Sequence, residues 1–154
     1  LGEFVPVKVW RVIGRAIETL AEKDRKKQIE LTVDCRNKDL AVSGVEDHIY
    51  RAVLNLVDNA LNYTDPGGKV AVACGQTDSG VQITVTDTGI GIAKEHLPRL
   101  FERFYRVDKA RSRDIGGTGL GLAIVKHVMN IHNGSVAVES EEAKGSKFTL
   151  TFPA

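Results

Sequence analysis

The sequence predicts an α+β fold, a two-layer sandwich in which helices cover one face of a mixed, mostly antiparallel sheet. Apolar and polar residues alternate in several short segments, which is typical of strands that bury only one face. Longer segments are apolar at helical spacing and can cover that face. Turn residues such as Thr77-Asp-Ser-Gly80 separate neighbouring strand segments, as in hairpins.

The N-terminal half begins with a helix and two short strands. Apolar residues at helical spacing predict a helix from Val9 to about Glu22. Strands are expected at Ile29–Cys35 and at Leu40–Ser43. The next helix runs from about Asp47, a plausible N-cap, to Tyr63, and it is apolar around most of its circumference. We therefore expect this second helix to be largely buried.

The C-terminal half alternates turns, strands and helices. Asp65-Pro-Gly-Gly68 is a turn signal, and Asn133-Gly134 predicts a helix end. Residues 103–116 are polar and show little periodicity. The expected elements are strands at Val70–Cys74 and Val81–Asp87, a short helix at Ala93–Glu102, a helix from Leu120 to about Ile131, and a final hairpin of Ser135–Ser140 and Lys147–Phe152.

Composition is that of one globular domain, residues 1–154. A hydrophobic content of 42%, a charged content of 27% and a net charge of +1 give no argument for nucleic acid or membrane contact. The chain starts without Met, so we expect a fragment of a longer protein, with residues 1–8 as a linker. Cys35 and Cys74 occupy apolar-phase strand positions, which favours two separate buried thiols over a disulfide or a metal pair.

Two glycine-rich segments suggest a binding site. Asp87-Thr-Gly-Ile-Gly-Ile92 closes a strand with a carboxylate, which can accept hydrogen bonds from a base or cap the following turn. Gly116-Gly-Thr-Gly-Leu-Gly-Leu122 opens an apolar helix, where uncovered backbone N–H groups suit phosphates. Together they predict a nucleotide site divided between two loops.

A polar stripe crosses the predicted buried helix. Asn55, Asn59 and Asn62 are spaced by four and three residues, so they share one face. Buried amides need partners, either in neighbouring loops or in a ligand. An amide oxygen is a suitable hard ligand for Mg²⁺, and three amides in register favour a ligand.

Five motifs, in this order, resemble those of the catalytic ATP-binding domain of bacterial two-component sensor histidine kinases. They are an N box at Asn55–Thr64, a first glycine box at Asp87–Ile92, an F box at Phe101–Arg106, a second glycine box at Gly117–Leu122 and a short glycine motif at Gly145–Phe148. The resemblance covers nearly the whole chain, and the run from Phe101 to Leu122 looks most similar to the phosphate-regulon (PhoR-type) and related kinases. It implies the Bergerat fold of the superfamily that includes type II topoisomerase, Hsp90 and MutL ATPase domains.

The resemblance also implies roles for single residues. Asp87 would accept the adenine amine, Tyr63 would stack on adenine, and Asn59 would be the Mg²⁺ ligand. Asn55 and Arg106 are the implied catalytic residues. Asn55 stands where ATP-hydrolysing relatives carry a Glu, and an amide cannot act as general base, which fits transfer of the phosphate rather than hydrolysis. Asn62 departs from the family, which often has Lys or Arg there.

The remaining implied contacts form one nucleotide-binding set with a lid from about Arg103 to Gly116. The full set comprises Asn59, Asn62, Tyr63, Asp87, Gly89, Gly91, Ile92, Tyr105, Arg106, Gly117, Thr118, Gly119, Leu120, Gly121 and Leu122.

The function implied is presentation of the γ-phosphate of Mg·ATP to a histidine on a separate dimerisation domain of the same protein. None of His48, His96, His127 and His132 lies in a phosphoacceptor motif. A response regulator would be an indirect partner, and the chain would be a cytoplasmic domain of a membrane-anchored sensor kinase. Two alternatives are an anti-sigma-factor-like serine kinase and a nucleotide-sensing module without transfer activity.

Overall fold

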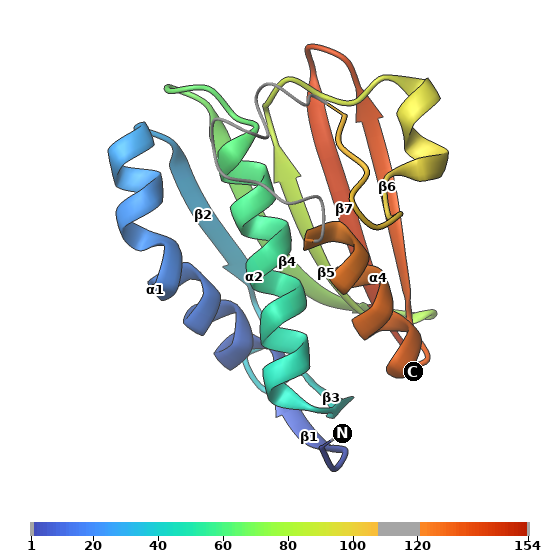
Figure 1. Cartoon of the computed structure of the whole chain (residues 1–154). Helices are drawn as coiled ribbons and strands as arrows, with labels where there is room; N and C mark the ends of the chain where they lie inside the picture. The colour runs from blue at the N-terminus through green and yellow to red at the C-terminus, as the bar shows by residue number, and fades with distance from the viewer. Residues whose placement is uncertain (1, 108–120, 154) are drawn as a thin grey trace.

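Two layers, a sheet and a set of helices, make up the part of the chain that the computed structural model describes, residues 2–107 and 121–153 (Figure 1). The elements, in chain order, are β1 (Val5–Lys8), α1 (Val9–Lys27), β2 (Glu30–Cys35), β3 (Ala41–Gly44), α2 (Glu46–Asn62), β4 (Lys69–Thr77), β5 (Gly80–Asp87), the 3₁₀ helix η1 (Lys94–Arg99), α4 (Gly121–Ile131), β6 (Ser135–Glu141) and β7 (Gly145–Phe152).

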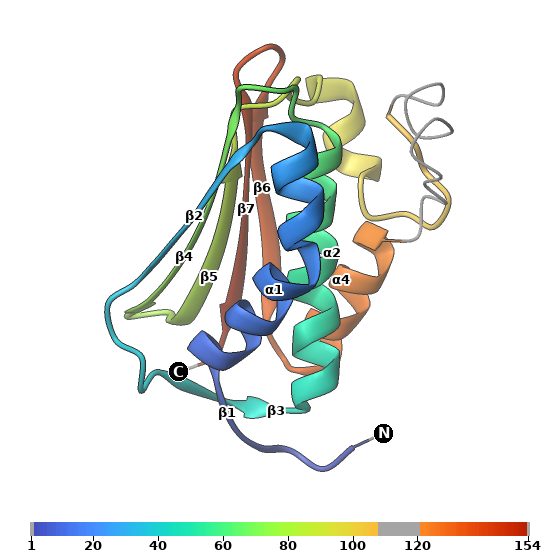
Figure 2. The same cartoon turned by 90° about the vertical axis from the view of Figure 1, so that its left-hand side faces the viewer.

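The main sheet has the strand order β2-β4-β5-β7-β6. Its pairs are antiparallel except for β2 and β4, which run parallel. Helices α1, α2 and α4 lie on one face of this sheet, and Figure 2 shows no helix on the opposite face among the described residues. The predicted α+β sandwich with a mixed, mostly antiparallel sheet is therefore confirmed.

Helix α2 is the centre of the helical layer, between α1 and α4 (Figure 1). Its apolar residues Ile49, Val53, Leu56 and Leu61 are almost completely buried. Each such side chain contributes about 1.5–3 kcal/mol when it leaves water. The sequence prediction of a largely buried helix at this position is correct.

The ends of the two long helices differ from the expectation. α1 continues past Glu22 to Lys27, because Lys23 Nζ lies 2.6 Å from Asp58 Oδ1 of α2 and so anchors the extra turn. α2 begins at Glu46, and no side chain caps it, so the prediction of Asp47 as N-cap is wrong.

His132 holds the residue that precedes α2. The Val45 N–H at the start of α2 donates to His132 Nε2 at 3.1 Å. His132 Nδ1 lies 2.8 Å from the Val128 carbonyl oxygen, which can only accept, so this nitrogen carries the proton. The imidazole is 2% exposed and joins the start of α2 to the end of α4.

Two further segments differ in detail. The expected helix at Ala93–Glu102 is a shorter 3₁₀ helix, η1, and it contains Pro98, which cannot donate a backbone hydrogen bond. Residues 5–8, which the sequence placed in a linker, form β1 and pair antiparallel with β3. A linker role for residues 1–8 in a longer protein stays a prediction.

The expectation of two separate buried thiols is wrong. Cys35 and Cys74 lie opposite each other in the parallel register of β2 and β4, with their Cα atoms 5.0 Å apart, and they form a disulfide. Alternation placed both residues on the inward face, but it could not show that these two strands are neighbours.

Candidate functional site

The site is organised by a carboxylate at the end of β5. Asp87 is 7% exposed, and its Oδ1 accepts the Gly89 N–H at 2.9 Å, the turn-capping contact that the sequence left open. The Ser146 N–H of β7 donates to the same carboxylate. Burial raises the pKa of Asp87 above its ordinary value, and these two N–H groups oppose the rise. A carboxylate has about four acceptor positions, so positions remain for a ligand.

The loop after Asp87, residues 88–92, is held by its surroundings. Its N–H groups donate from Thr88 to the Lys69 carbonyl at 3.0 Å, from Ile90 to the Tyr63 carbonyl at 3.1 Å, and from Ile92 to Ser140 Oγ at 2.8 Å. The loop is therefore fixed to the start of β4, the end of α2 and the end of β6. It is an ordered platform rather than a free surface loop.

The two glycines of this loop are required by packing. A Cβ on Gly89 would collide with the Tyr63 carbonyl oxygen. A Cβ on Gly91, whose φ is +71°, would collide with the Glu141 carbonyl oxygen. The protein's own backbone therefore demands glycine at both positions, independently of the nucleotide contacts that the family resemblance implies for them.

The three asparagines of α2 are half-buried, and they differ in their contacts. Asn55 Nδ2 donates to the Gly121 carbonyl oxygen at 3.3 Å, which ties α2 to the first turn of α4. The backbone carbonyl oxygen of Asn62 accepts a hydrogen bond from Lys27 Nζ at 3.3 Å. No hydrogen bond of the Asn59 side chain is present within residues 2–107 and 121–153, and its role as a metal ligand stays a prediction.

Thr64 is a site residue that the sequence analysis did not single out. It is completely buried, and its Oγ1 has no hydrogen-bond partner in the described part of the chain. The position that a Cβ on Gly89 would take lies 3.0 Å from Thr64 Oγ1 and 2.9 Å from Asp87 Oδ1. The hydroxyl and the carboxylate therefore converge beside Gly89. The only signal in the sequence was its place directly after Tyr63.

The F box residues lie against η1. Tyr105 Oη contacts His96 Nδ1, and the Arg99 guanidinium lies 4.6 Å from the Tyr105 ring centroid. Arg106, the next residue, is half-buried. These contacts orient Tyr105 toward η1, and the approach of Tyr105 and Arg106 to a ligand stays a prediction.

The second glycine box falls mostly outside the described residues. Gly117, Thr118, Gly119 and Leu120 lie outside them, as do residues 108–116 of the expected lid. Gly121 and Leu122 form the first turn of α4, where the structure places them next to Asn55 of α2.

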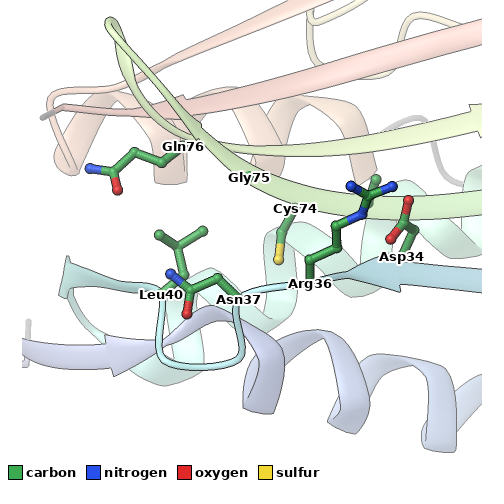
Figure 3. A pocket seen from close by; sticks show the side chains of 8 residues that line it. Asp34, Arg36, Asn37, Leu40, Cys74, Gly75 and Gln76 are labelled. Atoms are coloured by element: carbon green, nitrogen blue, oxygen red, sulfur yellow. The ribbon is translucent and has the colours of Figure 1, made fainter.

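A cavity of about 290 Å³ lies elsewhere, at the end of β2 and in the middle of β4 (Figure 3). Arg36, Asn37 and Gln76 line it together with Cys74. Cys74 pairs with Ile83, whereas Val70, at the other end of β4, pairs with Asp87. This cavity is therefore separate from the candidate site.

Residues 2–107 and 121–153 contain neither a candidate membrane span nor a cluster of the usual metal ligands. None of the helices there has the length and apolar character needed to cross a membrane. In the same residues, no three or more His, Cys, Asp or Glu side chains gather as a metal site would require.

Comparison with known proteins identifies the family. Residues 44–154 match the model for the histidine kinase-, DNA gyrase B- and HSP90-like ATPase family. The chain belongs to this family, which confirms the resemblance found in the five motifs.

Among curated proteins, the chain is similar to sensor histidine kinases. It is 45% identical over 153 residues to the sensor-like histidine kinase SenX3 of Mycolicibacterium smegmatis, covering 99% of this chain and 40% of that protein. It is 46% identical over 138 residues to the sensor histidine kinase CusS of Escherichia coli, covering 89% and 27% respectively. The chain thus spans less than half the length of these relatives. The similarity to SenX3 is consistent with the predicted subgroup.

Solved structures give the same result. The structure of the mycobacterial sensor histidine kinase MprB matches this chain with a TM-score of 0.82 and 34% sequence identity, and the match covers 97% of each chain. The catalytic domain of histidine kinase ThkA has a TM-score of 0.86 and 27% identity, with 99% of this chain and 96% of that chain covered. The fold is that of a histidine kinase catalytic domain. Neither alternative function gains support from these relatives.

The buried carboxylate predicts a specific pH dependence of stability. Because the folded-state pKa of Asp87 is raised above 3.8, the folded state holds this proton more tightly than the unfolded state. The protonated Asp87 therefore makes its full contribution to the free energy of unfolding at low pH, and this contribution is lost as the pH rises through the raised pKa. In Asp87→Asn this loss is absent. We therefore expect the free energy of unfolding of the variant, relative to wild type, to rise with pH, measured by urea denaturation.

The matched control is Asp78→Asn, at the exposed turn between β4 and β5. Its free energy of unfolding relative to wild type should show no such rise. A constant difference between Asp87→Asn and wild type from about pH 3 to about pH 7 would contradict the burial of an ionisable Asp87.

Proposed function

We propose that this chain is the ATP-binding catalytic domain of a sensor histidine kinase, and that it presents the γ-phosphate of Mg·ATP to a histidine on a separate dimerisation domain of the same protein. The observation that carries the proposal is the buried Asp87 carboxylate, fixed by two backbone N–H groups beside the asparagine face of α2. Full-length ShkA, solved in complex with AMPPNP, shares 27% identity and a TM-score of 0.83 with this chain, covering 100% of it and 32% of ShkA.

Asp87 would select adenine through its remaining acceptor positions. The adenine amine is a donor, whereas guanine has an acceptor oxygen at the same place, and two facing acceptors leave one buried group unpaired. That costs about 1–3 kcal/mol, which is enough for a useful preference for ATP. Gly89, Gly91 and Ile92 would form the platform under the base, with Tyr63 beside it at the end of α2.

Asn59 would hold the Mg²⁺ ion. Magnesium binds few protein ligands and completes its shell with phosphate oxygens and water. The Asn59 amide fits this role, because it is half-buried and forms no side-chain hydrogen bond within the described residues. Asn62 lies on the same face and would contribute a neutral contact to the nucleotide.

The phosphates would lie toward the first turn of α4. The N–H groups of Gly121 and Leu122 are at a helix N-terminus, where the helix dipole favours negative charge. Arg106, with Tyr105 beside it, would supply the positive charge, and Gly117, Thr118, Gly119 and Leu120 would complete the cradle.

The proposed chemistry is transfer rather than hydrolysis. The Asn55 amide is engaged with the Gly121 carbonyl and carries no basic group that could activate water. Positioning and charge neutralisation supply most of the catalysis of phosphoryl transfer, so the acceptor can come from another domain. A response regulator would then receive the phosphate from that domain, on the cytoplasmic side of a membrane-anchored sensor.

The metal assignment predicts the behaviour of Asn59 variants. Asn59→Ala should lose the Mg²⁺-dependent part of ATP binding and should still unfold cooperatively, because the amide has no partner in the described fold. Asn59→Asp should retain Mg²⁺ dependence, since a carboxylate is also a hard oxygen ligand. Calorimetry of ATP binding with Mg²⁺ and with EDTA measures both. Asn130→Ala, on the exposed face of α4, is the control. Full Mg²⁺ dependence in Asn59→Ala would place the metal elsewhere.

Incubation with γ-labelled ATP tests the proposed function as a whole. The chain alone should bind ATP without labelling itself, because none of its four histidines lies in an acceptor motif. Addition of the separate dimeric histidine domain should give acid-labile, base-stable label on that domain. Acid-labile label on the isolated chain would instead show that it contains its own acceptor.

A further inference from the structure

We propose that Ser140 of β6 is the positioning residue of the loop at residues 88–92. Its hydroxyl joins the far end of this loop, at Ile92, to the start of β7, which holds Asp87 at the near end. The inference rests on the proposed function, because it assigns Ser140 to the nucleotide affinity and base selectivity of the same site.

The hydrogen bonds around Ser140 have a single consistent direction. The Ile92 N–H donates to Ser140 Oγ at 2.8 Å. The Gly145 carbonyl oxygen, 3.0 Å away, can only accept, so it takes the Ser140 proton. Ser146 Oγ lies 2.7 Å from Ser140 Oγ and must then be the donor. Ser140 thus uses its one proton and both of its acceptor positions.

The start of β7 transmits the position of Ser140 to Asp87. Ser146 lies opposite Asp87 in the register of β5 and β7, and its N–H donates to the Asp87 carboxylate. Gly145, with φ of +106°, approaches Asp87 so closely that a Cβ there would collide with the Asp87 carbonyl oxygen. A shift of Gly145 or Ser146 therefore moves Asp87 directly.

Backbone contacts would preserve the fold if the hydroxyl were removed. The Ala143 N–H in the turn between β6 and β7 donates to the Ile90 carbonyl oxygen at 2.8 Å. Ser140 itself remains paired with Ser146 in the β6–β7 ladder. Loss of the hydroxyl leaves the Ile92 N–H without its partner and removes the link through Ser140 between Ile92 and the start of β7, whereas the sheet stays intact.

Three variants separate positioning from general stability. Ser140→Ala removes the hydroxyl, Ser140→Thr keeps it on a residue type that suits strands, and Ser135→Ala removes a hydroxyl from the other end of β6, where the side chain is exposed. Calorimetry and competition measure ATP and GTP binding to each. Ser140→Ala should raise the Kd for ATP about fivefold to tenfold, the effect of about one net hydrogen bond. Its preference for ATP over GTP should fall. The other two variants should stay within about twofold of wild type.

Amide hydrogen exchange in the nucleotide-free protein gives a second readout. The Ile92 and Gly89 amides should exchange about tenfold faster in Ser140→Ala, and the Ser140→Thr rates should match wild type. Unchanged exchange at Ile92 and Gly89 would overturn the proposal. So would equal losses of ATP and GTP affinity that follow the loss of global stability, because a merely structural residue behaves in that way. Failure of the wild type to bind ATP would overturn the proposed function instead, and the exchange rates would still decide the role of Ser140.

Discussion

Burial of a carboxylate at the end of β5 has a free-energy cost that the surrounding backbone must offset. The fold offsets part of this cost by directing the N–H groups of Gly89 and Ser146 at Asp87, and the pKa of the carboxyl stays raised. Both donors depend on further contacts, since Gly89 lies against the end of α2 and Ser146 is the second residue of β7. The position of this one charged group therefore links the sheet, the central helix and the β6–β7 hairpin.

Helix α2 connects the remaining parts of the site. On the side that faces α1, Asp58 pairs with Lys23, and Lys27 closes the end of the helix by donating to the Leu61 carbonyl oxygen at 2.7 Å. On the side that faces α4, Asn55 contacts Gly121, whereas Asn59 has no such contact in the described chain. The polar residues of α2 thus connect it to both neighbouring helices, and we propose that the remaining amide, Asn59, serves a ligand.

Much of this arrangement could be predicted from the sequence, because it depends on local pattern. Alternation gave the strands, helical spacing gave α2, and the carboxylate before the glycines gave the centre of the site. Contacts between distant segments could not be predicted. Three contacts depend on neighbours that only the assembled sheet and helices define. They are the hydrogen bond of His132 at the start of α2, the disulfide between Cys35 and Cys74, and the convergence of Thr64 with Asp87. Asp47 illustrates the reverse error, because a residue type that favours the N-cap lies within the first turn of α2, one residue after the helix begins.

The central claim is that Asp87 recognises the base of the nucleotide. Competition between ATP and GTP for the wild type, Asp87→Asn and the control Asp78→Asn tests it most directly. The account predicts that ATP binds the wild type and Asp78→Asn more tightly than GTP. In Asp87→Asn we expect weaker binding of ATP and a smaller difference in affinity between ATP and GTP, because an amide can rotate to present a donor to guanine. GTP that competes as well as ATP against the wild type would contradict the account.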